Sequence, residues 1–401
     1  MMTNTGSLKK SNMLNVIQII KEKGSITKPD IAALTGLTSA SIHNFIQELS
    51  EKQIVLEEGV NVSNGGRKAL LYRFNAKIRY IIGVYIALTN ITACVYDLDF
   101  NEKTKSVRPI DLAANEVEYS IKCVIEEIEK AIITAGISPQ SIAGVGITVP
   151  GPVNYEEGVV NKVVNAPNWK NIPLKSMIEK AIKLHVVVDK ETSGIVLYDK
   201  WFHAEEKTRN LVHITITNGV GSGILINRQL YRGEHNIAGE IGHMCVNPNG
   251  GVCNCGNIGC IELYADNPHI MGIVKSKLKE GEQSSLSNIN HISMEDILTA
   301  AAEKDLLATS VFRQASDYLV LVLGNIIKMF DPDEIIFDCY WLYKLPDMFS
   351  YIINKVFINN KMIDRTDIKI NVEQIEDLFL KGSATLIYDE LFNSYQTCTF
   401  L

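Results

Sequence analysis

Residues 239–262 read GEIGHMCVNPNGGVCNCGNIGCIE, a glycine-rich segment that holds one histidine and a set of closely spaced cysteines. One imidazole and three thiolates can enclose Zn2+ in a tetrahedron, with no position left for a catalytic water. The glycines and asparagines between them favour turns, so a short loop can wrap around one ion. The segment therefore predicts a structural zinc site formed by His243, Cys253, Cys255 and Cys260. Two alternatives remain: Cys245 replaces one ligand, or the cysteines carry no metal and His243 is a core residue.

From residue 80 onward, short apolar runs alternate with amphipathic stretches. Val117 to Ala135 places its apolar side chains on one face at helical spacing. Short buried strands are expected at residues 81–87, 91–97, 145–149, 186–188, 211–217, 223–226 and 335–337. This alternation predicts an α/β body of two lobes with a cleft, where ligands bind at the loops that follow strand ends. We expect the first lobe at residues 77–195 and the second at 196–401, with the C-terminal helix returning to the first lobe.

Residues 1–76 carry a different pattern, three short helices followed by a β-hairpin. The first helix is expected over Ser11–Lys23. Thr27 caps the second helix, which is expected to bury Ile31, Ala32 and Leu34. The third has an apolar stripe on one face, and the hairpin that follows has a glycine-rich, basic tip. This order predicts a winged helix-turn-helix domain that binds DNA, with a three-helix protein-interaction module as the alternative.

The polar face of the third helix fits the major groove, where amide side chains read adenine edges and hydroxyls read either partner. The expected DNA contacts on this helix are Ser39, Ser41, His43, Asn44 and Gln47. Arg67 and Lys68 at the hairpin tip suit phosphate or minor-groove contact. Residues 1–76 hold nine Lys and Arg against six Asp and Glu, a charge of +3 in a chain whose total is −7. The first 76 residues therefore form a basic module attached to an acidic body.

The overall composition is that of a globular protein. Of the 401 residues, 46% are hydrophobic, and we find no apolar run long enough to span a membrane. The N-terminus is polar and lacks the apolar core of a signal peptide. We therefore expect a cytoplasmic protein with no membrane partner, in a reducing compartment where clustered thiols bind metal.

Several motifs of the body resemble one known family. These are Thr217–Gly223 (TNGVGSG), Tyr231–Gly233, Gly239–His243 and Cys253–Glu262. They resemble the ROK family (repressors, open reading frames and kinases), over essentially the whole chain, because ROK repressors also carry an N-terminal winged helix. The stretch from Ile214 to Gly233 looks most similar to the xylose repressors of that family. The resemblance implies the two-lobed fold of actin-like sugar kinases.

The resemblance also implies a sugar site. The matching positions are Asn168, Glu240, His243 and Glu262, and we expect Glu191 to join them between the lobes. Carboxylate, imidazole and amide groups are what the hydroxyls of a polyol require. His243 would bind zinc with one ring nitrogen and face the sugar with the other. The alternative is that Glu240 and Glu262 only orient the zinc ligands.

The same comparison indicates that kinase chemistry is lost, so the chain is not expected to be an enzyme. Tyr85 stands where the family's kinases carry the aspartate of the first phosphate loop, and an aromatic ring cannot organise magnesium and phosphate. Ala87 and Leu88 replace the glycines of that loop. The catalytic Asn-Asp pair aligns best with Lys190-Glu191, and Phe337–Tyr340 replaces a glycine run near the adenosine.

The sequence therefore predicts a homodimeric or larger repressor that binds operator DNA and responds to a sugar, with xylose or another monosaccharide as effector. Three rivals stay open. The first is a sugar kinase with a regulatory DNA-binding head. The others are repressors controlled by a phosphosugar, at which Lys190 hints, or by a protein partner.

Overall fold

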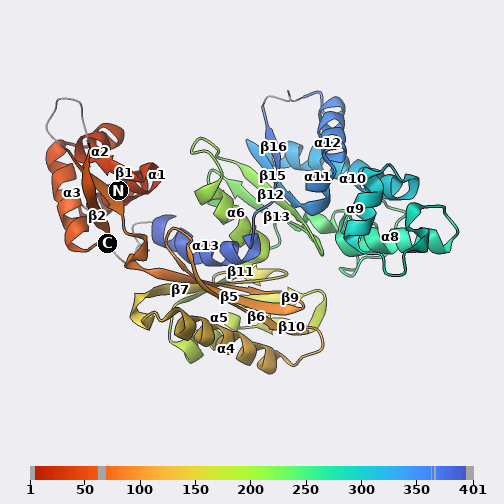
Figure 1. Ribbon diagram of the computed structural model, residues 1–401, viewed down its shortest axis with the longest axis horizontal. Helices are drawn as coiled ribbons and strands as arrows, with labels where there is room; N and C mark the ends of the chain where they lie inside the picture. The colour runs from red at the N-terminus through yellow and green to blue at the C-terminus, as the bar shows by residue number, and fades with distance from the viewer. Residues whose placement is uncertain (1–4, 62–68, 363, 365–366, 394–401) are drawn as a thin grey trace.

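The computed structural model describes residues 5–61, 69–362, 364 and 367–393. They form an N-terminal head and two α/β lobes (Figure 1). The head contains α1 (Thr5–Lys23), β1 (Ser25–Thr27), α2 (Lys28–Thr35), α3 (Ser39–Glu51), β2 (Val55–Asn61) and β3 (Ala69–Phe74). The first lobe contains β4 (Tyr80–Ile86), β5 (Asn90–Asp97), β6 (Glu102–Pro109), α4 (Val117–Ala135), β7 (Ile142–Val149), β8 (Val153–Asn154), β9 (Val159–Val163), β10 (Ala166–Ile172), α5 (Leu174–Ile182) and β11 (Val186–Lys190).

The remaining elements build the second lobe and two helices that pack between the lobes. They are α6 (Glu191–Phe202), β12 (Leu211–Ile216), β13 (Val220–Ile226), β14 (Gln229–Leu230), α7 (Glu262–Ala265), α8 (Asn267–Lys279), α9 (Met294–Ala302), α10 (Leu306–Phe330), β15 (Glu334–Cys339), α11 (Tyr340–Lys344), α12 (Pro346–Asn359), β16 (Lys369–Glu373) and α13 (Leu378–Asn393).

The head has the three helices and the hairpin that its sequence predicts. Thr27 caps α2 by accepting a hydrogen bond from the backbone N–H of Asp30, and Gly36 ends that helix with a left-handed φ of 69°. Thr38 caps α3 in the same way. Two local expectations are wrong: α1 begins at Thr5 rather than Ser11, and Leu34 is 54% exposed. The eight-residue α2 has too few turns to bury more than Ile31 completely.

The two lobes repeat one topology. In the first lobe β4 pairs antiparallel with β5 and parallel with β7, giving the strand order β11-β7-β4-β5-β6. In the second lobe β12 pairs antiparallel with β13 and parallel with β15, giving the order β14-β13-β12-β15-β16. The sequence predicted the central strands because each is a short apolar run, and the structure confirms them.

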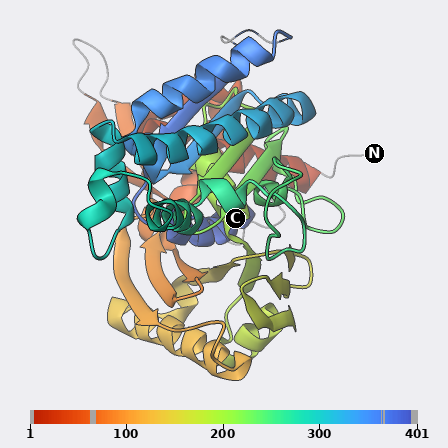
Figure 2. The same cartoon turned by 90° about the vertical axis from the view of Figure 1, so that its right-hand side faces the viewer.

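Helices cover both faces of the first sheet. α4 packs on β5 and β6, and α13 packs on β4 and β7 from the other side. α6 lies against α13 and also against β12 and β13 of the second lobe. Figure 2 shows α4 at the end of the molecule opposite to α12. The pair α6 and α13 therefore lies between the two sheets.

α10 is long and apolar enough to cross a membrane by length and composition, and 56% of its apolar window is buried inside the protein. Phe312, Leu319 and Leu323 on this helix are fully buried in the core of the second lobe. α10 therefore has the burial of a core helix.

Candidate functional site

The histidine and three cysteines of residues 239–262 come together as one cluster. The ligand atoms of His243, Cys253, Cys255 and Cys260 all lie within 4.8 Å of one another. His243 Nδ1 is 3.6 Å from Cys253 Sγ, and Cys255 Sγ is 3.7 Å from Cys260 Sγ. Cys245 is exposed and is not a member of this group. The donor set fits a four-coordinate metal ion, and zinc is the ion that three thiolates and one imidazole prefer.

Close backbone packing shapes the loop that carries these ligands. Gly259 has a φ of 61°, and a side chain there would meet the backbone of Asn247. Gly242 packs in the same way against the carbonyl of Val220 in β13. Backbone bridges pair Cys245 with Cys260 across the loop. The loop is therefore fixed to β13 on one side of Glu240 and closes on itself around the cluster.

Glu240, three residues before His243, contacts the first lobe through Lys190 at the end of β11. The Lys190 ammonium lies 3.5 Å from Glu240 Oε1 and donates a hydrogen bond to the carbonyl of Ala238. Lys190 is buried, with a residue exposure of 5%. A cation supplied by the first lobe therefore meets an anion and a carbonyl supplied by the second.

Glu191 begins α6 beside Lys190, and Tyr85 of β4 lies over it. The Tyr85 hydroxyl donates a 3.2 Å hydrogen bond to Glu191 Oε2, and its ring stacks on Phe379 at a centroid distance of 4.9 Å. Burial raises the pKa of Glu191 to about 7, and the nearby Glu240 charge adds to this rise. The Tyr85 hydrogen bond and Lys190 act in the opposite direction. Burial likewise raises the pKa of Tyr85, so the phenol keeps its proton.

Glu262 lies at the start of α7 and contacts the glycine-rich turn before β13. Its Oε2 accepts a 3.2 Å hydrogen bond from the backbone N–H of Val220. Packing explains the glycine at position 223 in β13, because a side chain there would meet the carbonyl of Thr192 in α6. Gly221 also faces Thr192 closely. These glycines allow β13 and α6 to pack together, which explains much of a pattern that resembles a phosphate loop.

Asn168 is exposed on β10. Among the described residues, no recorded hydrogen bond joins it to the other four predicted sugar residues. Asn165, at the turn before β10, accepts a 3.2 Å hydrogen bond from Asn254 of the cysteine loop. The small sheet that carries Asn168 therefore touches the second lobe at that loop.

The structure adds a second inter-lobe ion pair that the sequence did not indicate. Arg232 lies 2.8 Å from the buried carboxylate of Asp189, the residue before Lys190. Its guanidinium also stacks on the ring of Tyr155, 3.6 Å from the centroid. Nothing in the local pattern joins residues so far apart in sequence.

We call Lys190, Glu191, Glu240, His243 and Glu262 the polar site.

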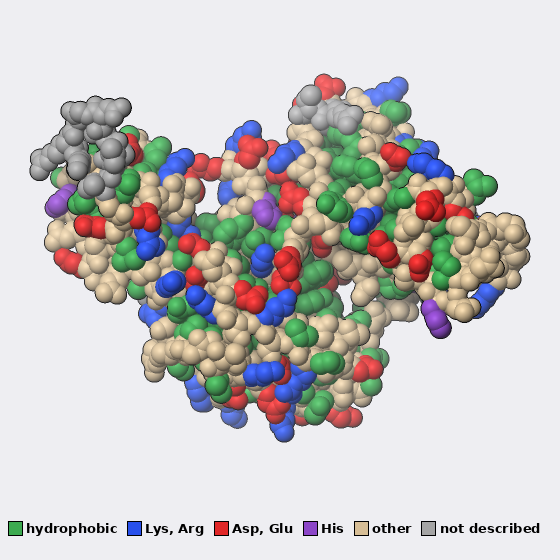
Figure 3. Space-filling view, in the orientation of Figure 1, with side chains coloured by type: hydrophobic (Ala, Val, Ile, Leu, Met, Phe, Trp, Pro, Cys, Tyr) green, Lys and Arg blue, Asp and Glu red, His purple; other side chains and the backbone are tan. Residues whose placement is uncertain are grey.

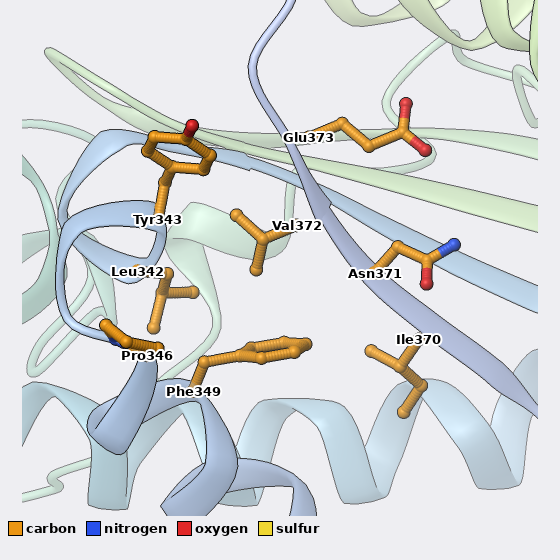
Figure 4. Close-up of a pocket in the computed structure, with 8 residues that line it drawn as sticks. All are labelled: Leu342, Tyr343, Pro346, Phe349, Ile370, Asn371, Val372 and Glu373. Carbon is orange, nitrogen blue, oxygen red and sulfur yellow. The ribbon is translucent and has the colours of Figure 1, made fainter.

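A hollow of about 480 Å³ lies away from the polar site, between α11, α12 and β16 (Figure 4). It is lined by Leu342, Tyr343, Pro346, Phe349, Ile370, Asn371, Val372 and Glu373. None of the predicted sugar residues lines it. Five of its eight lining residues are apolar, and of the polar ones Asn371 donates to Glu334 and Glu373 pairs with His203, so few polar groups are left to bind a sugar.

The outer face of α3 presents most of the predicted DNA contacts. Ser39, His43, Asn44 and Gln47 are exposed. Ser41 is half-buried, and its hydroxyl lies 2.9 Å from Thr38 Oγ1 within the helix cap. Arg67 and Lys68 lie outside the described residues. Figure 3 shows basic and acidic side chains interleaved over one face of the molecule, so charge alone does not mark a DNA surface there.

Lys28, which the sequence reasoning did not single out, lies beside α3. Its ammonium is 3.4 Å from His43 Nδ1. A cation next to the exposed face of this helix is suited to a phosphate.

Comparisons with known proteins agree with this architecture. Residues 81–342 match the ROK family. The xylose repressor of Caldicellulosiruptor bescii is 30% identical over 347 residues, which cover 84% of this chain and 84% of that protein. The dual regulator NagC of Escherichia coli is 25% identical over 336 residues, which cover 83% of this chain and 81% of that protein.

Among solved structures, a ROK family transcriptional regulator described as a homologue of the E. coli MLC protein has a TM-score of 0.82. It is 27% identical to this chain, and the match covers 98% of this chain and 99% of that one. The resemblance read from the sequence motifs is therefore confirmed. This chain belongs to the ROK family, with a helical head followed by two lobes of the ROK sugar-kinase fold.

Proposed function

We propose that this chain is a transcriptional repressor that binds an operator through its head and leaves it when a neutral monosaccharide occupies the polar site. The observation that carries this proposal is the contact of Tyr85 with Glu191. Tyr85 aligns with the phosphate-loop aspartate of the family's kinases, and its contact with Glu191 supports an aromatic side chain at that position, beside carboxylates suited to sugar hydroxyls. The relatives named above include a xylose repressor and NagC, which supports a regulator over a kinase.

The charges of the polar site favour a neutral sugar over a phosphosugar. Lys190, next to Glu191 in the chain, is already paired with the Glu240 carboxylate and donates a hydrogen bond to the carbonyl of Ala238. A phosphate would bring about two more negative charges next to Glu191, Glu240 and Glu262. Sugar hydroxyls, which donate and accept, can instead bond to these groups without new charge. Asn168 and the free ring nitrogen of His243 would complete the set.

ATP-dependent phosphoryl transfer is disfavoured at the same place. The reaction needs a metal–phosphate cluster and a base, and Tyr85 supplies no metal ligand. Gly221 and Gly223 within β13 pack against α6, and Glu262 already accepts the backbone N–H of Val220. These contacts leave little of the phosphate-binding machinery free.

The head would read DNA with α3 in the major groove of each half-site of a palindromic operator. Ser39, His43, Asn44 and Gln47 are placed for base contact, and Lys28 for a phosphate. A homodimer would present two such helices about one helical turn of DNA apart, or a multiple of it. We propose that the Zn2+ site keeps the loop of Glu240 in position, in the cytoplasm, where thiols stay reduced.

Thermal unfolding against a ligand panel tests the effector. The panel holds D-xylose, N-acetylglucosamine, xylose 5-phosphate and ATP with magnesium. We expect one free sugar to raise the Tm of the parent chain. Glu240→Gln should abolish this rise, and the exposed control Glu282→Gln should retain it. A rise with ATP and magnesium would instead support the kinase, and a rise with the phosphosugar alone would support that rival.

Selection of duplexes from a random pool tests the DNA proposal. We expect an inverted repeat that the sugar identified above releases from the protein. Binding to no duplex, or equal binding to all, would contradict a sequence-specific repressor. If no ligand of the panel raises the Tm but an inverted repeat is selected, control by a protein partner would be favoured.

A further inference from the structure

α13 runs from the polar site to the head. Phe379, at its N-terminal end, stacks on Tyr85, which bonds to Glu191. Phe392, in its last turn, packs edge-on against Phe74 of the head with centroids 6.0 Å apart. Figure 1 shows this helix lying on the sheet of the first lobe with its C-terminal end directed to the head. One helix of about 24 Å therefore touches both places.

The middle of α13 is tightly packed against α6 and β7. A side chain on Gly382 would lie 2.8 Å from the backbone of Ile195 in α6, so the two helices cross at backbone contact. Ser383 bonds to Thr148 of β7 at 2.6 Å, with both residues fully buried. Because packed interiors are close to incompressible, a displacement at one end of such a helix is passed to the other.

At the head, Lys21 of α1 joins three parts of the molecule. Its ammonium donates to the carbonyl of Leu98 at 2.9 Å and to Asp99 Oδ1 at 2.8 Å, both after β5 of the first lobe. It also lies over the ring of Phe74, 4.2 Å from the centroid. The rings of Tyr388 and Phe392 in α13 are 5.5 and 5.4 Å away. The Lys21 side chain is 12% exposed, so it is an internal contact rather than a surface charge.

A second polar contact fixes the same joint. Gln18, one turn before Lys21 on α1, donates a 3.0 Å hydrogen bond to the carbonyl of Phe392. Buried residues of α1, β3 and α13 belong to one continuous apolar core. The head is therefore packed onto α13 and the first lobe, and does not hang on a linker.

We infer that Lys21 is a positioning residue that fixes the DNA-binding head on α13, and that α13 couples the polar site to the head. The coupling rests on the proposed function, since it needs an effector at the polar site and DNA at the head. The mechanical connection itself does not, and it can be measured without either ligand.

Hydrogen exchange of the full chain, free of sugar and DNA, tests the connection. Phe379→Leu removes the aromatic ring that stacks on Tyr85 at the end of α13 far from the head. We expect roughly fivefold faster exchange in residues 14–23 of α1. Phe312→Leu is the matched control, because it trims a fully buried ring in the core of the second lobe. Unchanged exchange of α1 in Phe379→Leu, or equal acceleration by both variants, would overturn the inference.

The joint is tested with Lys21→Met against Lys9→Met, which removes the same charge from the same helix at an exposed pair with Glu48. D-xylose is the probe, with its Kd and the exchange of α1–α3 both measured. We expect Lys21→Met to bind xylose within about twofold of the parent while losing the response of the head, and Lys9→Met to keep both. An intact response in Lys21→Met would refute the joint. If the parent chain does not bind xylose, the choice of effector fails, and the ligand-free exchange of Phe379→Leu decides the coupling alone.

Discussion

Glu191→Gln is the substitution whose effect follows most directly from the structure. In the folded chain, burial raises the pKa of Glu191 from 4.5 to about 7. Ionising this carboxyl in the folded chain therefore costs at most about 3 kcal/mol more than in the unfolded chain. The Gln side chain has the shape of the protonated acid and can still accept the hydrogen bond from Tyr85.

The sign follows from the raised pKa. Below pH 4.5 the carboxyl is protonated in the folded and the unfolded chain, so it does not lower the free energy of unfolding. As the pH rises from 4.5 to 7 the unfolded chain loses the proton and the folded chain keeps it, so stability falls. Above pH 7 the whole cost is present. The stability of Glu191→Gln relative to the parent should therefore increase by roughly 2–3 kcal/mol between pH 5 and pH 8.

Urea unfolding of both chains at pH 5 and pH 8, at one ionic strength, measures this difference. Other titrating groups cancel because they are common to the two chains. Glu282→Gln is the control, since that carboxylate is exposed at a surface pair with Lys277, and its stability should stay within about 1 kcal/mol of the parent at both pH values. A Glu191→Gln difference that stays constant with pH would show that Glu191 ionises normally, and the account of the polar site would fail.

Three further predictions concern the frame of the site. Cys255→Ser should lose the zinc measured by atomic absorption and lower the Tm by roughly 2–4 °C for ~2 kcal/mol, while Cys245→Ser keeps both, and equal losses would place Cys245 in the metal site. Asp199→Asn leaves the buried His213 without the carboxylate 2.6 Å away and should cost roughly 3–5 kcal/mol in urea, whereas Asp317→Asn at a surface pair with Lys355 should cost under about 1 kcal/mol; similar costs would contradict the burial argument. Gly223→Ala should cost roughly 1–3 kcal/mol because its side chain meets the Thr192 carbonyl, and Gly272→Ala in α8, where a side chain meets nothing within 4 Å, should be tolerated; equal costs would contradict this packing argument.

Local signals were sufficient for much of the fold. The caps at Thr27 and Thr38 depend on residues within one turn, and each central strand is a continuous apolar run, so the sequence predicted them correctly. The metal cluster was predicted for the same reason, because its ligands lie close together in the chain. Burial was harder: Leu34 has the pattern of a core residue, and its exposure depends on how few turns α2 has.

The contacts between distant segments could not be predicted. The sequence offers Lys190 only as a hint of a phosphosugar site, because its partners Ala238 and Glu240 are defined by how the two lobes meet. The same holds for Arg232 with Asp189 and for Lys21 with its rings. A lysine in an amphipathic helix normally faces solvent, and only the packing of α1 against the first lobe encloses this one.

Tyr85 contacts both the polar site and α13. Its hydroxyl meets Glu191 inside the polar site, and its ring meets Phe379 at the start of α13. An aspartate at this position could hold metal and phosphate but would reach Phe379 with no aromatic face. Tyr85 is thus the residue that links the polar site to the helix beneath the head. It follows that Tyr85→Phe, which keeps the ring and loses the hydroxyl, should leave the exchange of α1 as in the parent, while Tyr85→Leu should accelerate it as Phe379→Leu does. The two substitutions separate the hydrogen bond from the stacking contact. Equal acceleration by both would assign the coupling to the hydroxyl, and no acceleration by either would refute a coupling through Tyr85.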